Sequence, residues 1–288
     1  MKLVSYIRRG HGSAAASYGA LVGDRIIELA TPGAPSLRQA LATEGIAGLQ
    51  SRLASASNSA GIAQSEVQLL PPIPDPEKIL CIGLNYYLHA KEVNMPVPSQ
   101  PSVFVRYPNS LVGQGQPVLR PPESEQLDYE AELAVVIGRG GRRIPEASAM
   151  EHVAGYACLA ENSVRDWQRH SNQATPGKNF FHSGAFGPWL VTPDEAGPPD
   201  QMRVVGRLNG EEMQRDTIDQ LIFPIPFLIA YLSTFTELVP GDVISTGTPA
   251  GVGISKKPQL WMKSGDVFEV EITGLGVLRN PVLDDINQ

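Results

Sequence analysis

Residues 128–138 read Asp128-Tyr129-Glu130-Ala131-Glu132-Leu133-Ala134-Val135-Val136-Ile137-Gly138. The apolar run after the second glutamate predicts a strand. Successive strand side chains point to opposite faces, so Glu130 and Glu132 share one face and lie about 7 Å apart. Two carboxylates on one strand suit a hard divalent cation such as Mg²⁺ or Ca²⁺, which takes oxygen ligands. The alternative is a solvated strand face, which spacing alone favours because charged side chains are mostly exposed.

A third acid, Glu161, follows the apolar run Tyr156-Ala157-Cys158-Leu159-Ala160. A carboxylate at the mouth of a buried strand must be paired or coordinated to be tolerated. Together with Glu130 and Glu132 it would leave room for water and substrate on an octahedral Mg²⁺. The spacing equally allows an ordinary helical ion pair between Glu161 and Arg165, four positions later.

His89 and Glu92 form a second cluster. If residues 86–93 are helical, positions three apart share a face, and a carboxylate oriented on an imidazole makes a general base near neutral pH. A lone histidine is more often structural, but the glutamate and the neighbouring aromatic side chains favour the catalytic interpretation here. We expect no comparable partner for the other histidines, His11, His152, His170 and His182.

Lys178 lies between glycine and aromatic residues in the segment Pro176-Gly177-Lys178-Asn179-Phe180-Phe181. Such a lysine is a candidate carboxylate anchor or oxyanion stabiliser. The alternative is a loop lysine in water. The segment is not a phosphate-binding loop, because the G-x-x-x-x-G-K-[ST] spacing is absent.

Length, composition and charge narrow the class of protein. The chain has 288 residues, which predicts one large domain or a large and a small one. Its net charge of −7 argues against a nucleic-acid binder, which would normally carry a basic stripe. Cys81 and Cys158 lie in apolar runs and are expected to be buried free thiols. No apolar run is long enough to span a membrane, and the first residues are too polar for a secretory signal. We therefore expect a cytoplasmic protein.

The first 70 residues read as a small accessory domain without a cluster of chemically active side chains. Weak alternation predicts strands at residues 2–7, 18–22 and 25–29, and apolar spacing predicts short helices at residues 36–42 and 46–54. The proline-rich stretch Leu70-Pro71-Pro72-Ile73-Pro74-Asp75-Pro76 is a stiff linker, because proline fixes φ. We therefore predict two domains, residues 1–70 and residues 71–288.

The second domain is predicted to be mainly β. Strands are expected at residues 79–83, 103–106, 128–138, 154–159, 204–208, 211–215, 241–246 and 265–272, and helices at 145–152 and 226–238. Asn209-Gly210 is the strongest hairpin signal. A polar helical turn is expected at residues 162–168, and a long loop is expected at residues 169–188. Because long loops inside compact domains are often functional, this loop is a candidate for a role in function. There is no regular strand–helix alternation of the parallel α/β type.

Five short motifs occur in order along this domain. They are Gly83-Leu84-Asn85-Tyr86, Asp128-Tyr129-Glu130-Ala131-Glu132-Leu133, Arg165-Asp166-Trp167-Gln168, Gly177-Lys178-Asn179-Phe180 and Thr246-Gly247-Thr248-Pro249-Ala250-Gly251-Val252-Gly253. Together they closely resemble the fumarylacetoacetate hydrolase family, over about residues 75–280. The nearest pattern is that of bacterial members such as acylpyruvate hydrolases and 2-hydroxyhepta-2,4-diene-1,7-dioate isomerases, many of which also carry a small N-terminal unit.

The resemblance implies a fold and a site. The fold is a distorted β-roll catalytic domain, mainly β in an α+β chain, with a small N-terminal α+β domain, usually in a homodimer. The resemblance implies Mg²⁺ or Mn²⁺ held by Glu130, Glu132 and Glu161, and catalysis by His89, Glu92 and Lys178, with residues 86–93 in a segment that often orders over substrate. It places Tyr86, Arg106, Arg165, Gln168 and Thr248 against a small keto-acid substrate.

Two adjacent positions depart from the family pattern. The family usually carries Asn-Asp where this chain has Ala160-Glu161. Glutamate is one methylene longer, so its carboxylate must fold back or push the metal outward. We expect a metal still to bind, with altered geometry, affinity or metal preference.

The resemblance implies chemistry on 2-keto and β-diketo acids. Our main expectation is metal-dependent hydrolysis of a C–C bond in an acylpyruvate such as maleylpyruvate or fumarylpyruvate, in aromatic-compound catabolism. His89, oriented by Glu92, would deprotonate water, and the products would be pyruvate and a carboxylic acid. The alternative is a decarboxylase or an isomerase or tautomerase of an oxaloacetate-like or hydroxydienoate acid. A third possibility is a non-catalytic keto-acid binder whose metal site Glu161 has spoiled.

Overall fold

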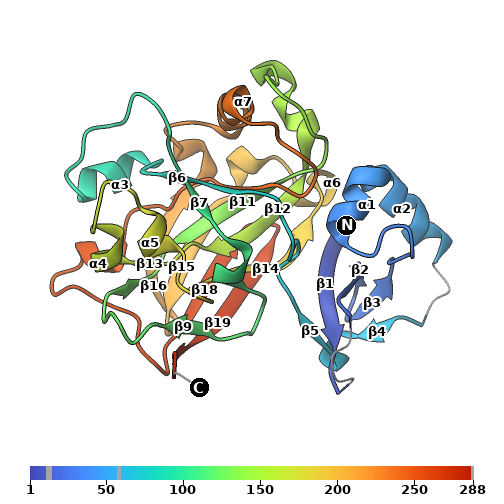
Figure 1. The fold of residues 1–288 in the computed structure, drawn as a ribbon, viewed down its shortest axis with the longest axis horizontal. Helices are drawn as coiled ribbons and strands as arrows, with labels where there is room; N and C mark the ends of the chain where they lie inside the picture. Colours follow the sequence, from blue (N-terminus) through green and yellow to red (C-terminus); the bar gives the residue numbers. More distant parts are fainter. Residues whose placement is uncertain (11–14, 57–59, 287–288) are drawn as a thin grey trace.

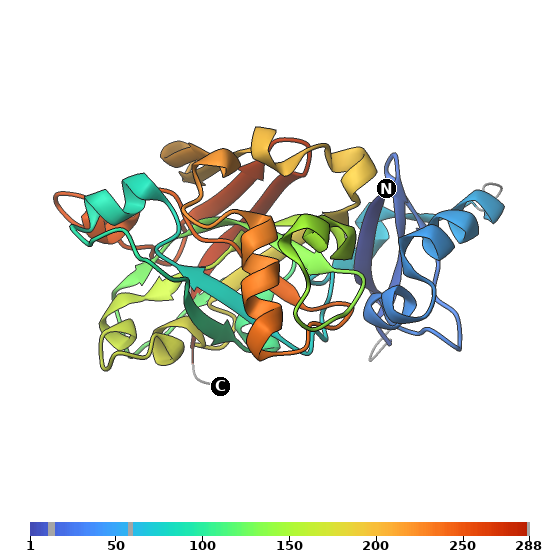
Figure 2. The same cartoon turned by 90° about the horizontal axis from the view of Figure 1, so that it is seen from above.

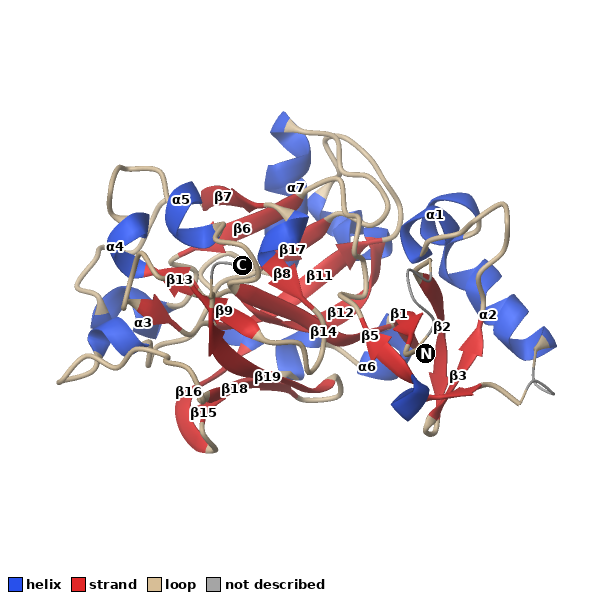
Figure 3. Ribbon diagram, turned by 60° about the horizontal axis from the view of Figure 1, so that its bottom comes forward, coloured by secondary structure: helices blue, strands red, loops and turns tan. Residues whose placement is uncertain are grey.

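A computed structural model describes residues 1–10, 15–56 and 60–286 of the chain. Strands dominate, as Figures 1 and 3 show, and short helices lie around them. The predicted mainly β, α+β class is therefore confirmed. In the described part of the chain no helix is long and apolar enough to cross a membrane.

The larger sheet runs through the whole molecule in the order β4-β3-β2-β1-β14-β12-β11-β17-β6-β7, with β5 on β1 and β8 on β14. Its strands are β1 (Lys2–Arg8), β2 (Ser17–Val22), β3 (Arg25–Glu28), β4 (Ile62–Ala63), β5 (Val67–Leu69), β6 (Ile79–Gly83), β7 (Ser102–Arg106), β8 (Leu111–Val112), β11 (Ala131–Ile137), β12 (Val153–Ala160), β14 (Gly184–Val191) and β17 (Val243–Ser245).

A second sheet packs against the middle of the first. It has the order β16-β15-β18-β19-β9, with β9 (Val118–Arg120), β15 (Arg203–Leu208), β16 (Glu211–Thr217), β18 (Val267–Ile272) and β19 (Gly276–Asp284). β11 and β12 contact β15 and β18, and Leu133, Val135, Val204 and Val270 belong to one buried apolar cluster between them. The short strands β10 (Leu127–Asp128) and β13 (Ser163–Val164) pair beside the site described below.

The helices are short. They are α1 (Leu37–Thr43), α2 (Gly45–Ser55), α3 (Tyr87–Glu92), α4 (Arg165–Gln168), α5 (Thr175–Lys178), α6 (Pro193–Ala196) and α7 (Ile225–Phe235). The 3₁₀ turns are η1 (Gln64–Glu66), η2 (Pro108–Ser110), η3 (Glu146–His152), η4 (Pro199–Gln201), η5 (Ile218–Gln220) and η6 (Gly253–Ser255). Figure 2 shows α7 lying across the strands of the larger sheet.

The described residues up to Leu69 lie at one end of the molecule, with α1 and α2 on β1, β2 and β3 (Figure 1). The first strand of this region is joined to the rest by hydrogen bonds, because β1 pairs antiparallel with β14, with Lys2 opposite Val191 and Leu3 opposite Leu190. The two regions therefore share one sheet. The boundary near residue 70 stays a prediction.

Several local predictions are confirmed and others need correction. Asn209 and Gly210 connect β15 to β16 with positive φ angles of 54° and 82°, as a tight hairpin requires. Both cysteines are buried and free. The helix predicted at residues 145–152 is instead the 3₁₀ turn η3, and α7 ends at Phe235 rather than at 238, because Thr236 is extended.

The strand predicted over residues 128–138 is interrupted. β10 ends at Asp128 and β11 begins at Ala131, opposite Ala160 of β12. The main chain stays close to its neighbour across the gap, since the Glu161 N–H donates to the Glu130 carbonyl at 2.9 Å. Glu130 therefore lies just before a buried strand and Glu161 just after the adjacent one.

Candidate active site

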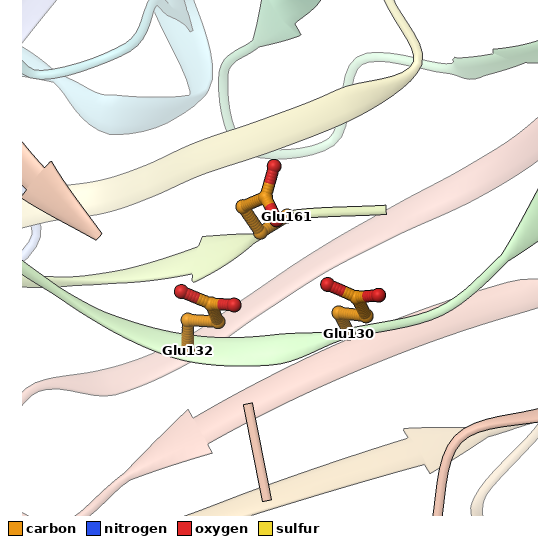
Figure 4. A group of neighbouring side chains, drawn as sticks. All are labelled: Glu130, Glu132 and Glu161. Carbon is orange, nitrogen blue, oxygen red and sulfur yellow. The ribbon is translucent and has the colours of Figure 1, made fainter. Parts of the chain in front are cut away.

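Three glutamates converge where β11 and β12 meet, as Figure 4 shows. Each of Glu130, Glu132 and Glu161 offers a carboxylate oxygen, and these oxygens lie within 4.8 Å of one another. The residues are only 4%, 2% and 0% exposed. A solvated strand face is therefore excluded, and the cluster predicted from sequence is present.

Three cations contact the cluster, namely Lys178, Arg106 and Arg165. Lys178 Nζ, at the end of α5, lies 2.7 Å from Glu130 Oε2 and also contacts the Glu161 carboxylate. Arg106 Nη1, at the end of β7, lies 2.9 Å from Glu161 Oε1. Buried carboxylates are tolerated because they are paired in this way.

The alternative pairing of Glu161 with Arg165 does not form. Arg165 turns toward Asp128 and Glu130, with contacts of 2.8 and 2.6 Å. The reason is local structure: Glu161 precedes β13 and is not part of the helix that Arg165 begins, so the helical spacing does not apply.

Glu132 is the least neutralised of the three acids. Its carboxylate accepts hydrogen bonds from the Gly247 N–H at 2.8 Å and from the Ser245 hydroxyl. Burial, together with the Glu161 and Glu130 carboxylates, raises the pKa of Glu132 well above its usual value. For Glu130 burial acts in the same direction, but Arg165 and Lys178 outweigh it and hold the pKa of Glu130 well below its usual value.

The donor set fits a hard divalent cation. It consists of three buried carboxylates around one point, which is the ligand chemistry of Mg²⁺ and Mn²⁺. A bound cation would relieve the repulsion that raises the pKa of Glu132. The longer side chain at position 161 does not displace its carboxylate from the cluster.

His89 and Glu92 form the predicted pair on α3. His89 Nδ1 lies 2.8 Å from Glu92 Oε1, and His89 is buried. The Gly251 N–H donates to both Glu92 oxygens, at 3.0 and 2.9 Å. Gly251 has a φ of +107°, and a Cβ there would overlap the Met213 carbonyl, so only glycine lets the turn hold Glu92.

The same glycine-rich turn also holds Asp128. Its carboxylate accepts from the Gly253 and Ile254 N–H groups at 2.7 and 3.0 Å, and from Arg165 Nε. Asp128 thus positions Arg165, a role that our sequence reasoning did not assign. The alternation of Asp128 with Glu130 and Glu132 along the chain was the sequence signal from which a role at the site could have been inferred.

Arg165 in turn orients Gln168, since its Nη1 donates to Gln168 Oε1 at 2.9 Å. That hydrogen bond leaves the Gln168 amide N–H₂ to donate elsewhere. Thr248 is held by donating its hydroxyl to the Ala131 carbonyl at 3.0 Å and by accepting from Gln214 at 2.7 Å. These contacts fix three of the side chains that the resemblance places against substrate.

A cavity of about 410 Å³ brings the site together. Its lining includes eight predicted residues: His89, Glu130, Glu132, Glu161, Arg165, Gln168, Lys178 and Thr248. Val93, Met95 and Arg169 also line it, within the segments 86–98 and 169–186 from which a pocket wall is expected. The other lining residues, which were not predicted, are Ile82, Gly83, Leu84, Phe104 and Ile254. Glu92 lies outside the lining and reaches it through His89.

Arg106 and Tyr86, predicted to bind substrate, lie outside the lining. The Arg106 guanidinium is fully buried and donates to Ser110, Asn162, Ser183 and Glu161. These hydrogen bonds engage the guanidinium with Glu161 and its surroundings, and the contact of Arg106 with substrate stays a prediction. Tyr86 is also fully buried, and its hydroxyl has no hydrogen-bond partner within the described residues.

The chain is similar to known proteins both in sequence and in fold. The family model described as fumarylacetoacetate (FAA) hydrolase, C-terminal, matches residues 78–283. A Xenopus laevis protein named oxaloacetate tautomerase fahd2, mitochondrial, is 44% identical over 229 residues, which are 79% of this chain and 72% of that one.

Two solved structures are similar along the whole chain. The first is 2-hydroxyhepta-2,4-diene-1,7-dioate isomerase from Mycobacterium marinum, with a TM-score of 0.77, 26% identity and coverage of 100% of both chains. The second is maleylpyruvate hydrolase from Sphingobium sp. SYK-6 in complex with manganese(II) and pyruvate, with a TM-score of 0.81, 26% identity and 99% coverage of both chains.

Proposed function

The chain belongs to the fumarylacetoacetate hydrolase family, and from that premise we propose that it is a divalent-metal-dependent keto–enol tautomerase of an oxaloacetate-like 2-keto acid. The observation that carries the proposal is one cavity lined by both the three-glutamate cluster and His89. Curated relatives named as oxaloacetate tautomerases favour this chemistry over the acylpyruvate hydrolysis that we expected first.

A metal held by Glu130, Glu132 and Glu161 would act as a Lewis acid that polarises the 2-keto group and favours its enolate. Lys178 would donate a hydrogen bond to the end of the substrate that faces the glutamate cluster. Burial acts to lower the pKa of Lys178, but the Glu130 and Glu161 carboxylates outweigh it and raise that pKa, so the side chain stays a protonated hydrogen-bond donor. The Gln168 amide, fixed by Arg165, is a second donor into the cavity.

His89 moves the proton. Its Nδ1 faces Glu92, which leaves Nε2 to accept a proton from C3 of the keto acid. The electron pair of the broken C3–H bond forms the C2–C3 double bond of the enolate. The imidazolium then delivers the proton to the C2 oxygen, giving the enol, and the reverse sequence regenerates the ketone. No water or covalent nucleophile is consumed.

A second candidate is C–C hydrolysis of an acylpyruvate, as the resemblance first implied. The intact His89–Glu92 pair favours it, because the same base could activate water, and so does the likeness to maleylpyruvate hydrolase. Decarboxylation uses the same polarised keto acid. These reactions share the site and differ in the bond that breaks.

A panel of substrates separates the candidates. Purified protein with Mg²⁺ or Mn²⁺ would be given oxaloacetate and acetylpyruvate, and enol–ketone interconversion, CO₂ release and pyruvate release would be followed. We expect accelerated interconversion of oxaloacetate without stoichiometric CO₂. Pyruvate release from acetylpyruvate in place of interconversion would move the protein to the hydrolase branch. Absence of both turnover and bound metal would leave the non-catalytic binder whose metal site Glu161 has spoiled.

The expected homodimer and the cytoplasmic location stay predictions. Light scattering on purified protein would test the first, and imaging or fractionation of the native protein the second. The Xenopus laevis and Homo sapiens relatives named as oxaloacetate tautomerases are also named as mitochondrial, so their location differs from the one expected here.

A further inference from the structure

The cations that line the cavity differ in whether a carboxylate of the protein pairs with them. Arg165 and Lys178 each contact a glutamate of the cluster, at 2.6 and 2.7 Å. Arg169 lines the same cavity, yet no carboxylate within the described ranges 1–10, 15–56 and 60–286 lies within ion-pair distance of it. Its Nε donates to the Arg165 carbonyl at 3.3 Å, which leaves the outer guanidinium nitrogens for a ligand.

Arg169 is an exposed residue of the cavity lining, whereas Arg165 and Lys178 are buried. It follows directly after α4, one helical turn beyond Arg165, and is exposed, whereas the three glutamates are buried. Figures 1 and 3 show α3, α4 and α5 gathered on one side of the molecule. The lining also includes the apolar side chains of Val93, Met95 and Ile254. Arg169 is therefore an exposed cation of the lining, without a carboxylate partner among the described residues, next to a buried glutamate cluster.

We propose that Arg169 binds the second carboxylate of a 2-keto dicarboxylic acid whose 2-keto carboxylate end faces the glutamate cluster. A guanidinium matches a carboxylate because two parallel N–H donors can meet its two oxygens. The inference rests on the proposed function for the identity of the reaction. The subsite itself would serve a tautomerase and a hydrolase alike, since maleylpyruvate and fumarylpyruvate also carry a distal carboxylate.

The charges that line the cavity leave Arg169 for a ligand. Arg165 and Lys178 contact the Glu130 carboxylate, and Lys178 also contacts Glu161. Arg169 lines the same cavity without a carboxylate partner among the described residues. A second carboxylate on the ligand would supply the counter-charge that Arg169 lacks.

The test compares two ligands that differ only in the distal carboxylate, pyruvate and oxaloacetate. Their affinities for the Mg²⁺-loaded protein would be measured by calorimetry for the wild type, Arg169→Gln and Arg169→Lys. Arg142→Gln, at another exposed arginine that lies outside the cavity lining, is the matched control. Catalytic constants for oxaloacetate would be measured in parallel.

We expect Arg169→Gln to weaken oxaloacetate binding about tenfold or more, and pyruvate binding by less than about twofold. Arg169→Lys should recover part of the lost oxaloacetate affinity, because lysine keeps the positive charge but lacks the two parallel N–H donors of the guanidinium. KM for oxaloacetate should rise with little change in kcat, since Arg169 does not touch the reacting atoms.

Equal effects on both ligands, or none on either, would overturn the subsite. Failure of the proposed function looks different: the wild type would bind oxaloacetate more tightly than pyruvate in an Arg169-dependent way and yet not interconvert its keto and enol forms. In that case the subsite stands and the assigned reaction does not.

Discussion

Lys178 Nζ lies 2.7 Å from Glu130 Oε2 in surroundings where neither side chain is more than 5% exposed. The ammonium also contacts Glu161, so it neutralises two carboxylates that would otherwise repel each other. Lys178→Met should therefore destabilise the metal-free protein by about 3 kcal/mol, because it leaves buried charge unpaired. Urea unfolding in the presence of a chelator measures this loss.

Added Mn²⁺ should recover part of that stability in the Lys178→Met variant, since a cation among the glutamates replaces the missing charge. Lys91→Met, at an exposed position of α3, is the control and should behave like the wild type. Unchanged unfolding of chelated Lys178→Met would show that this ion pair does not hold the cluster together.

His89→Ala should separate proton transfer from metal binding. The imidazole contacts Glu92 and lines the cavity, but it is not one of the clustered carboxylates. We expect Mn²⁺ affinity to stay near that of the wild type while turnover falls by about 100-fold or more. Lys91→Ala on the same helix is the matched control. Full turnover by the His89 variant would remove the histidine from the mechanism.

Glu132→Gln should abolish the response of the protein to metal without unfolding it. The Glu132 carboxylate is buried beside two others, and burial together with those neighbours raises its pKa. Removing its charge should leave the chelated protein at least as stable as the wild type. In the wild type, Mn²⁺ at 100 times Kd should add about 2.7 kcal/mol of stability, and the variant should show almost none of it. A wild-type-sized increase in Tm for the variant would refute Glu132 as a ligand.

Arg106→Lys should weaken metal binding although Arg106 lies outside the cavity lining. The guanidinium holds Glu161 Oε1 while donating to Ser183 Oγ at 2.9 Å and to the Asn162 carbonyl at 3.0 Å. Lysine cannot reproduce this planar set of donors. We expect Mn²⁺ affinity, measured by calorimetry, to fall by about 10- to 100-fold. Unaltered affinity would limit Arg106 to a role in folding.

Much of the site was predictable because its side chains follow local rules. The i,i+3 spacing of His89 and Glu92 needed only a short helix, and α3 supplies it. The spacing of Glu130 and Glu132 indicated one face, and the apolar run before Glu161 indicated a neighbouring strand end. The Asn209-Gly210 hairpin likewise depends on residues adjacent in sequence.

The remaining features depend on pairing between distant segments. Arg106 reaches Glu161 because β7 and the end of β12 meet in space, which no short motif encodes. Arg165 prefers Asp128 over Glu161 because β10 pairs with β13. The pairing of β1 with β14 joins residues almost 190 positions apart, as with Lys2 and Val191. Long-range contacts of this kind decide which cation meets which carboxylate.

The most direct test of the central claim follows C3 proton exchange and enol–ketone interconversion of oxaloacetate by NMR. It uses the wild type with Mg²⁺, the wild type with a chelator, and His89→Ala with Mg²⁺. We predict rapid interconversion in the first sample and rates near the uncatalysed background in the other two. Interconversion that is equally fast with the chelator or without His89 would contradict a metal- and histidine-dependent tautomerase.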